Sequence, residues 1–247
     1  MKNVILCGYN WSGCKALDLL LEAGHKVYVY THEAPAHVND LIQLCEKRSV
    51  PFTTKKVTAD NLPFAPDIIC SIYYRYLIGE GVIDACGKKI FNLHPSLLPE
   101  YRGCSSLTWA MIEGDAHAGF SYHYVTKRFD EGNIILQKKV KIEDFDTQQS
   151  LYFRVMFEAL SHFNEVVDLV ASNYKGTVQD CTRGAYYKRG CPHDGTIDSS
   201  WSAEKIERFI RAMVFPPLPY ARFADSEVTS VSGYRAILGK AKLKDEA

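Results

Sequence analysis

Short apolar segments alternate with segments of helical character through the first third of the chain, and this alternation constrains the fold more than any other feature. The apolar runs of strand length are 4–8, 27–30, 67–72 and 90–93. The intervening segments with helical spacing are 14–22, 41–47 and 81–86. Strands that alternate with helices in this way form a mostly parallel sheet with right-handed crossovers. The sequence therefore predicts an α/β, Rossmann-like fold.

The middle of the chain predicts an extension of this sheet. Residues 106–114 have the pattern of a helix, and 120–125 and 134–142 have that of strands, which we expect to be antiparallel. Asp146, followed three residues later by Gln149, has the spacing of a capping box at a helix start. The apolar stripe after it predicts one long amphipathic helix that closes the first domain.

The composition changes after this helix. Residues 173–202 hold glycines, prolines and short polar segments, and a brief helical pattern follows around 206–213. The last thirty or so residues predict short strands before a charged, frayed tail. We therefore expect a Rossmann-like domain over 1–172 and a small α+β segment over 173–247.

The overall composition excludes several functions. Hydrophobic residues make up 47% and charged residues 23%, as in ordinary globular proteins, and the formal net charge of zero argues against nucleic acid as the partner. No apolar run approaches a membrane span, and the amino terminus lacks a signal-peptide pattern. The eight cysteines show neither Cys-x-x-Cys pairs nor zinc-finger spacing. These patterns predict a cytoplasmic protein with reduced thiols and no metal, nucleic-acid or membrane partner.

Residues 90–103 carry the clearest chemical signal. Asn92 and His94 lie two apart on a predicted strand, so their side chains point to the same side. Pro95 and Pro99 end that strand, which places both groups at its carboxyl end, the usual place for sites in open α/β sheets. Further on, Asp130 offers a carboxylate just before a glycine turn.

An amide, an imidazole and a carboxylate together suit acyl transfer to an amine. Asn92 and protonated His94 can donate hydrogen bonds to the tetrahedral oxyanion. Asp130, directly or through one water, can accept the proton that the attacking ammonium must lose. No Gly-x-Ser-x-Gly elbow is present, which favours direct transfer between two bound substrates. The alternative for each residue alone is a strand-end Asn in a turn and a His satisfied in the core.

Three sequence blocks resemble the 10-formyltetrahydrofolate-dependent formyltransferases. The blocks are Asn92-x-His94-x-Ser96-Leu97-Leu98-Pro99-x-Tyr101-Arg102-Gly103, Gly119-Phe120-Ser121-Tyr122-His123 and Asp130-x-Gly132-x-Ile134. That group includes the methionyl-tRNA, glycinamide ribonucleotide and sugar-nucleotide N-formyltransferases. The resemblance covers most of residues 1–172 and implies the formyltransferase fold for them.

The resemblance also implies roles for particular residues. Asn92, His94 and Asp130 correspond to the catalytic triad, and His123 to a second histidine that supports it. The co-substrate would be 10-formyltetrahydrofolate, without a metal, and its pterin would lie against residues 73–78 and 126–130. The residues implied in donor binding are Tyr76, Leu77, Ile78, Thr126, Lys127 and Phe129.

The C-terminal blocks are similar to those of small bacterial enzymes that formylate a nucleotide-linked 4-amino or 3-amino dideoxysugar. The blocks are 186–189, 194–198, 201–202 and 206–217. Methionyl-tRNA enzymes carry a longer basic barrel there, and glycinamide ribonucleotide enzymes usually stop earlier. The likeness implies a dTDP- or GDP-linked acceptor, a homodimer, a role in O-antigen or other surface polysaccharide biosynthesis, and substrate binding or dimerisation by 173–247. The residues expected to contact the acceptor are Asn10, Trp11, Ser96, Arg102, Gly103, Tyr187, Arg189 and Arg211.

Several alternatives stay open. The acceptor can be another amine, such as glycinamide ribonucleotide. The turn 8–13 with Glu33 after the second strand also permits an NAD-dependent sugar-nucleotide enzyme, although Asn10 stands where a second glycine should let a pyrophosphate approach. That turn can equally be a plain strand-to-helix connection. Tyr187 can pack on the protein instead of a nucleobase, and Arg211 can serve a diphosphate or a solvated helix face.

Overall fold

The computed structural model describes residues 1–245, with side chains up to residue 238. This part of the chain forms two compact units, each assembled from three separate stretches. The first unit consists of 1–94, 120–138 and 156–183, and the second of 95–119, 139–155 and the chain from 184 onward. These units are defined by how compactly the chain packs and not by what they bind. The expected boundary between a catalytic domain over 1–172 and a substrate-binding or dimerisation segment over 173–247 therefore stays a prediction.

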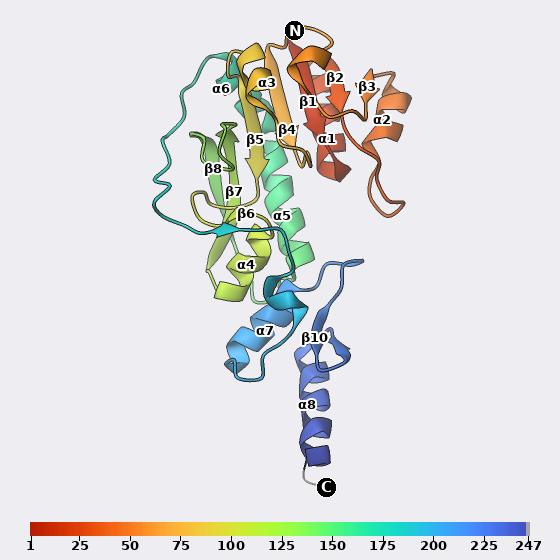
Figure 1. The fold of residues 1–247 in the computed structure, drawn as a ribbon, viewed down its shortest axis with the longest axis vertical. Helices are drawn as coiled ribbons and strands as arrows, with labels where there is room; N and C mark the ends of the chain where they lie inside the picture. Colours follow the sequence, from red (N-terminus) through yellow and green to blue (C-terminus); the bar gives the residue numbers. More distant parts are fainter. Residues whose placement is uncertain (246–247) are drawn as a thin grey trace. The chain divides into compact units, whose positions relative to one another are not determined.

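The first unit is built on a seven-stranded sheet in the order β3-β2-β1-β4-β5-β7-β8. The strands are β1 (Asn3–Gly8), β2 (Lys26–Tyr30), β3 (Phe52–Thr53), β4 (Ile68–Ile72), β5 (Ile90–His94), β7 (His117–Tyr124) and β8 (Ile134–Lys141). Strands β1 to β5 pair in parallel, and β7 pairs with β5 in the antiparallel direction. Figure 1 shows β1, β2, β4 and β5 side by side. The prediction of a mostly parallel, Rossmann-like sheet is confirmed.

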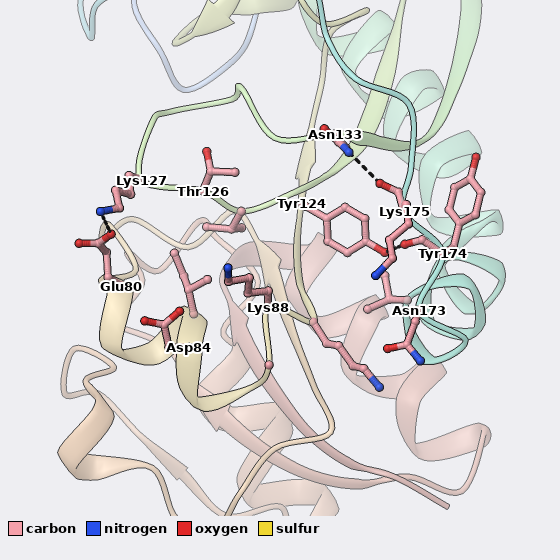
Figure 2. Close-up of a pocket in the computed structure, with 15 residues that line it drawn as sticks. Glu80, Asp84, Lys88, Tyr124, Thr126, Lys127, Asn133, Asn173, Tyr174 and Lys175 are labelled. Carbon is pink, nitrogen blue, oxygen red and sulfur yellow. Dashed lines mark hydrogen bonds and ion pairs between the residues drawn. The ribbon is translucent and has the colours of Figure 1, made fainter.

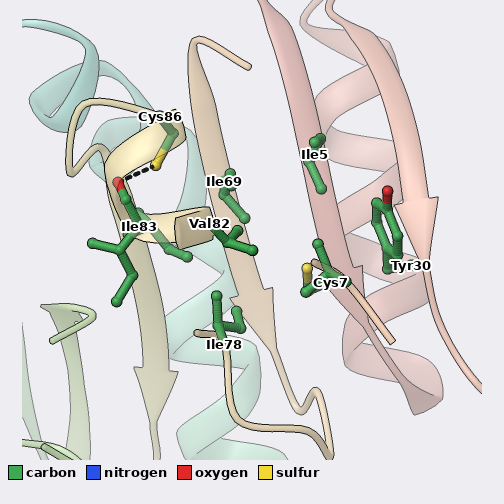
Figure 3. Packing of buried hydrophobic residues seen from close by; sticks show 10 residues of the cluster. Ile5, Cys7, Tyr30, Ile69, Ile78, Val82, Ile83 and Cys86 are labelled. Atoms are coloured by element: carbon green, nitrogen blue, oxygen red, sulfur yellow. Dashed lines mark hydrogen bonds between the residues drawn. The ribbon is translucent and has the colours of Figure 1, made fainter. Parts of the chain in front are cut away.

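Helices connect these strands and cover the sheet. They are α1 (Asn10–Glu22), α2 (Leu41–Arg48), the 3₁₀ turn η1 (Ala59–Asn61), α3 (Glu80–Ala85), α5 (Gln148–Ser161) and α6 (Phe163–Ala171). Helices α1 and α6 pack on each other and against β1 and β4. On the other face, α3 contributes Val82 and Ile83 to a buried cluster with Ile69 of β4 (Figure 3). Both faces are therefore covered, which explains why β4 is buried along its whole length and β1 at every position after its first residue.

The predicted long helix is two helices, α5 and α6, separated at His162. In an unbroken helix the carbonyl of Ala159 would accept the N–H of Phe163. It accepts instead from His162 N, at 3.1 Å, and from the Tyr122 hydroxyl of β7, at 2.9 Å. A side chain that enters the hydrogen-bond ladder is a known cause of helix breaks.

The capping box at the start of α5 is also shifted by one residue. Thr147 N donates to Ser150 Oγ and Ser150 N donates to Thr147 Oγ1, at 3.0 and 3.2 Å. The predicted cap residue, Asp146, is fully buried and forms an ion pair with Arg154. Because the Asp146 carboxylate pairs with Arg154, Thr147 and Ser150 cap the helix in its place.

The second unit contains short strands and helices around α4 and α7. Its elements are β6 (Arg102–Gly103), α4 (Ser106–Glu113), β9 (Tyr186–Tyr187), the 3₁₀ turn η2 (Pro192–Gly195), α7 (Ala203–Ala212), β10 (Ala221–Phe223), β11 (Ser226–Val228) and α8 (Val231–Asp245). Helix α7 buries Ile206, Phe209 and Ile210 and packs against α4. The predicted short strands are present, but the tail expected to be frayed belongs to the helix α8 up to Asp245, and its last two residues lie outside the described part of the chain.

Candidate active site

Strand β5 presents Asn92 and His94 at its carboxyl end. The side chains of Phe91 and Leu93 alternate with them and are buried in the core. Because β5 lies between β4 and β7, its backbone is hydrogen-bonded on both edges. The strand is therefore a rigid platform that holds the two polar groups on one side of the sheet.

The amide of Asn92 is oriented by two neighbours. Ser71 Oγ of β4 donates to Asn92 Oδ1 at 2.9 Å, and Asn92 Nδ2 lies 3.2 Å from His123 Nε2 of β7. His123 Nδ1 lies 2.9 Å from the carbonyl oxygen of Tyr124, which can only accept, so Nδ1 carries a proton. In the neutral imidazole Nε2 is then an acceptor for Asn92. This network leaves one N–H of the Asn92 amide available to another acceptor.

Asp130 lies beside both histidines. Its Oδ1 is 3.8 Å from His94 Nδ1 and 3.5 Å from His123 Nε2, and all three side chains are largely buried. The structure thus brings together the four residues predicted for catalysis and its support. An amide donor, an imidazole and a carboxylate in this arrangement can stabilise an oxyanion and move a proton.

The turn that carries Asp130 depends on two unusual backbone positions. Asp130 itself has a φ of 57°, in the left-handed region where aspartate is among the more tolerated non-glycine residues. At Gly132, a Cβ atom would lie 1.8 Å from the carbonyl oxygen of Tyr124. Only glycine therefore lets the turn return against β7 at this point.

The residues predicted to bind the donor lie on two loops of the same unit. Leu77 and Phe129 are 47% and 54% exposed, so each offers apolar surface to a flat aromatic ligand. Tyr76 lies between the guanidinium of Arg75 and the ring of His32. Ile78 is 5% exposed and packs in the core, so its side chain is not open to a donor contact.

A cavity of about 500 Å³ adjoins one of these loops. Thr126 and Lys127 line it, together with residues of α3, of the loop between α3 and β5, and of the end of α6 and the segment after it (Figure 2). Lys127 forms an ion pair with Glu80 at its edge. Asn92, His94 and Asp130 are not among the lining residues, so this cavity lies apart from the predicted chemistry.

Asn10 occupies a backbone conformation that favours glycine. Its φ is 54°, and its Oδ1 accepts a hydrogen bond from Ser12 N at 2.8 Å at the start of α1. Asparagine tolerates this region better than most residues, and its side chain also satisfies an N–H of the first turn. This explains how asparagine can stand where a dinucleotide-binding turn would carry its second glycine. Next to it, Trp11 packs against Phe157, with ring centroids 5.0 Å apart.

The other predicted acceptor residues belong to the second unit, where most already have protein contacts. Tyr187 stacks between Tyr101 and Trp109, at centroid distances of 5.8 and 4.6 Å. This favours the alternative in which its ring packs on the protein. At Gly103, a Cβ would lie 2.2 Å from the Tyr187 carbonyl oxygen, so β6 approaches β9 closely.

Among the remaining four predictions in this unit, Arg189 is the most accessible. Ser96 Oγ donates to the carbonyl of Glu100 at 2.7 Å, and Arg102 is buried. Arg211 Nη1 donates to the carbonyl of Asp146 at 2.8 Å. Arg189 is exposed, so its guanidinium is open to a ligand.

Two residues near the site were not found from the sequence. Ser71, which orients Asn92, is the polar residue in the otherwise apolar strand β4. A single polar residue in a buried apolar strand could have indicated a site residue from the sequence. Gln179, which contacts the Asp130 turn, lies in an irregular segment and carries no such signal.

Among the residues that the structure describes, no group of three or more His, Cys, Asp or Glu is arranged to hold a metal ion. Over the same part of the chain, no helix has the length and apolar character needed to cross a membrane. All eight cysteines are free thiols.

Comparison with known proteins identifies the class to which this fold and site belong. Residues 11–167 match the formyl transferase family, and the chain therefore belongs to that family. GDP-perosamine N-formyltransferase of Brucella melitensis is 36% identical over 226 residues, which cover 88% of this chain and 87% of that protein. The predictions of a formyltransferase and of its fold are confirmed.

Solved structures agree on the fold. The N-formyltransferase from Helicobacter canadensis, in complex with folinic acid and dTDP-3-aminofucose, superposes with a TM-score of 0.80 over 93% of this chain and 86% of that one, at 20% identity. WlaRD, a sugar 3N-formyl transferase studied with dTDP and 5-N-formyl-THF, gives 0.79 over 93% and 85%, also at 20% identity. At this level of identity the likeness establishes the architecture.

Proposed function

We propose that this formyltransferase transfers the formyl group of 10-formyltetrahydrofolate to the amino group of a nucleotide-linked 4-amino or 3-amino dideoxysugar. The observation that carries the proposal is the grouping of Asn92, His94 and Asp130 at the carboxyl end of β5. The name of the Brucella relative supports a sugar-nucleotide acceptor and favours a GDP-linked one. The ligands named for the Helicobacter structure support a folate donor.

The reaction begins when the lone pair of the neutral amine attacks the formyl carbon on N10 of the folate. The new C–N bond gives a tetrahedral oxyanion, which accepts hydrogen bonds from Asn92 Nδ2 and from protonated His94. One N–H of Asn92 is held by His123 and the second faces the oxyanion.

Proton transfer completes the reaction. The ammonium formed in the attack gives its proton to the Asp130 carboxylate, directly or through one water. The oxyanion then re-forms the carbonyl as the bond from carbon to N10 breaks, and the proton that Asp130 accepted passes to N10, directly or through one water. The products are the formamido sugar and tetrahydrofolate, so no covalent enzyme intermediate is needed.

The proposal extends to finer features that rest on the sequence resemblance. We infer that the enzyme is a cytoplasmic homodimer in the biosynthesis of a surface polysaccharide such as O-antigen. The donor's pterin lies between the loops that carry Leu77 and Phe129, which are the exposed apolar residues of those loops. Arg189 is exposed, so among the arginines predicted to contact the acceptor it is the one whose guanidinium is open to pair with a diphosphate.

A panel of acceptors tests the proposed function. The purified protein is incubated with 10-formyltetrahydrofolate and with GDP-perosamine, other GDP-, dTDP- and UDP-linked amino sugars, or glycinamide ribonucleotide. Mass spectrometry then follows the formylated product. We expect formylation of at least one amino sugar and none of glycinamide ribonucleotide. Turnover of glycinamide ribonucleotide alone would overturn the proposal, as would thermal stabilisation by NAD without any by the folate.

A further inference from the structure

Gln179 joins the irregular segment after α6 to the turn that carries Asp130. Its Nε2 donates to the carbonyl oxygen of Asp130 at 2.9 Å and to that of Gly132 at 2.6 Å. The side chain is only 9% exposed. One amide therefore holds two backbone carbonyls on either side of Glu131, from a position 49 residues away in the sequence.

These two hydrogen bonds act on a turn with an unusual backbone conformation. Asp130 has a left-handed φ of 57°, and Gly132 touches the Tyr124 carbonyl so closely that no other residue fits. A short turn with such dihedrals has few backbone hydrogen bonds of its own to define its shape. Fixing the Asp130 carbonyl fixes the peptide plane next to its Cα, and with it the direction of the carboxylate toward His94.

The orientation of the amide is settled by its partners. A flipped amide would place Oε1 against two carbonyl oxygens, which cannot donate. With Nε2 on the carbonyls, Oε1 is buried and has no hydrogen-bond partner among the residues that the structure describes. An apolar side chain of similar size would fill this space without an unpaired acceptor, so the donor capacity of the amide is the feature that explains the residue.

We propose that Gln179 is a positioning residue, which holds the Asp130 turn so that the carboxylate can accept the proton released during formyl transfer. The inference rests on the role proposed above for Asp130. Gln179 touches neither substrate in this scheme and acts only through that residue.

The chain supplies a matched control for the test. Asn133 Nδ2 donates to the carbonyl oxygen of Lys175 at 2.9 Å, and so joins the same two segments with the same kind of bond (Figure 2). It does not contact the Asp130 carbonyl. The backbone pair of Ile134 and Thr177, with two bonds of 2.8 Å, keeps the segments together in either variant.

The first experiment compares Gln179→Leu, Gln179→Glu and Asn133→Ala at saturating donor and acceptor. A displacement of a reacting group by about 1 Å can cost on the order of a hundredfold in rate. We expect kcat to fall by about tenfold to a hundredfold in both Gln179 variants, with the two KM values nearly unchanged. Asn133→Ala should stay close to the parent. Equal losses in Asn133→Ala, or parental kcat in a folded Gln179 variant, would overturn the inference.

A second experiment separates the inference from the proposed function. Gln179→Leu is introduced into an Asp130→Asn background, and thermal melts confirm that each variant is folded. If Gln179 acts through Asp130, the second substitution should cost little further turnover. Fully additive losses would show that Gln179 acts elsewhere. Parental turnover of Asp130→Asn alone would instead remove the role of Asp130 and the proposed mechanism.

Discussion

Asn92 Nδ2 lies 3.2 Å from His123 Nε2, so the amide that faces the proposed oxyanion is already anchored on one of its two N–H groups. Ser71 anchors its oxygen in the same way. A donor held at two points loses little freedom when it binds a developing negative charge, which is the condition for effective transition-state stabilisation.

Replacing this amide should therefore reduce turnover far more than binding. For Asn92→Ala we expect kcat to fall by about a hundredfold or more, as for loss of a single oxyanion donor. Steady-state kinetics with both substrates varied measures the effect. Ser71→Ala, which loosens the amide but keeps it, is the comparison and should lose less. A fall in Asn92→Ala no larger than that in Ser71→Ala would contradict the donor role.

His94 and Asp130 should behave as one unit. Each alanine variant should lose most of its turnover while it stays folded and still binds the folate. The turnover of the double variant should be only slightly below that of the less active single variant. The Oδ1–Nδ1 distance of 3.8 Å is the structural reason, because the two groups share one site. Rapid-quench turnover and folate titration supply the two readouts. If the fold-loss of turnover in the double variant were the product of the two single losses, a shared role would be contradicted.

Much of this site could be predicted because it follows from local rules. Asn92 and His94 fall on one side of β5 through strand alternation, and Gly132 marks a turn that only glycine fits. The alternation of apolar strands and helices likewise determined the sheet. These features depend on residues that are close together in the sequence.

Several of the features that the sequence did not show depend on contacts between distant residues. The break between α5 and α6 is associated with the Tyr122 hydroxyl, which bonds the Ala159 carbonyl across 37 positions of sequence. Tyr187 stacks on Tyr101 and Trp109, which a local reading of residues 186–189 cannot show. The position of Gln179 is likewise defined by tertiary contact alone.

Alkaline pH should destabilise the first unit through its buried thiols. Burial raises the pKa of Cys45 to about 12 and that of Cys86 to about 11. In the unfolded chain a thiol ionises near pH 8.5. Because the folded pKa is the higher one, this contribution to stability is complete below pH 8.5 or so. It is lost as the pH rises toward 11–12.

Urea unfolding at a series of pH values measures this effect. Each such thiol adds a slope of up to about 1.4 kcal/mol per pH unit in that window. Cys45→Ala should be less stable than the parent at neutral pH and should show a shallower alkaline decline. Cys104→Ala, at a partly exposed position, is the control and should keep the parental slope. A decline that does not change in Cys45→Ala would show that other groups cause it.

Arg189 and Arg211 were both predicted to hold the acceptor's diphosphate, and the structure separates what their removal should do. Arg211 Nη1 donates to the buried carbonyl of Asp146, so Arg211→Ala should lower the free energy of unfolding by about 1–3 kcal/mol. Arg189 is exposed, and its replacement should change stability by less than about 0.5 kcal/mol.

If Arg189 pairs with the diphosphate, Arg189→Ala should instead raise the acceptor KM and leave the donor KM unchanged. Some turnover can fall too, because binding energy from remote parts of a substrate also positions the reacting amine. Kinetics with the acceptor identified by the panel, together with urea unfolding of both variants, distinguishes the two roles. An unchanged acceptor KM in Arg189→Ala would show that the diphosphate binds elsewhere. The turn at Asn10, at the start of α1, would then be tested next, because free N–H groups at a helix amino terminus favour anions.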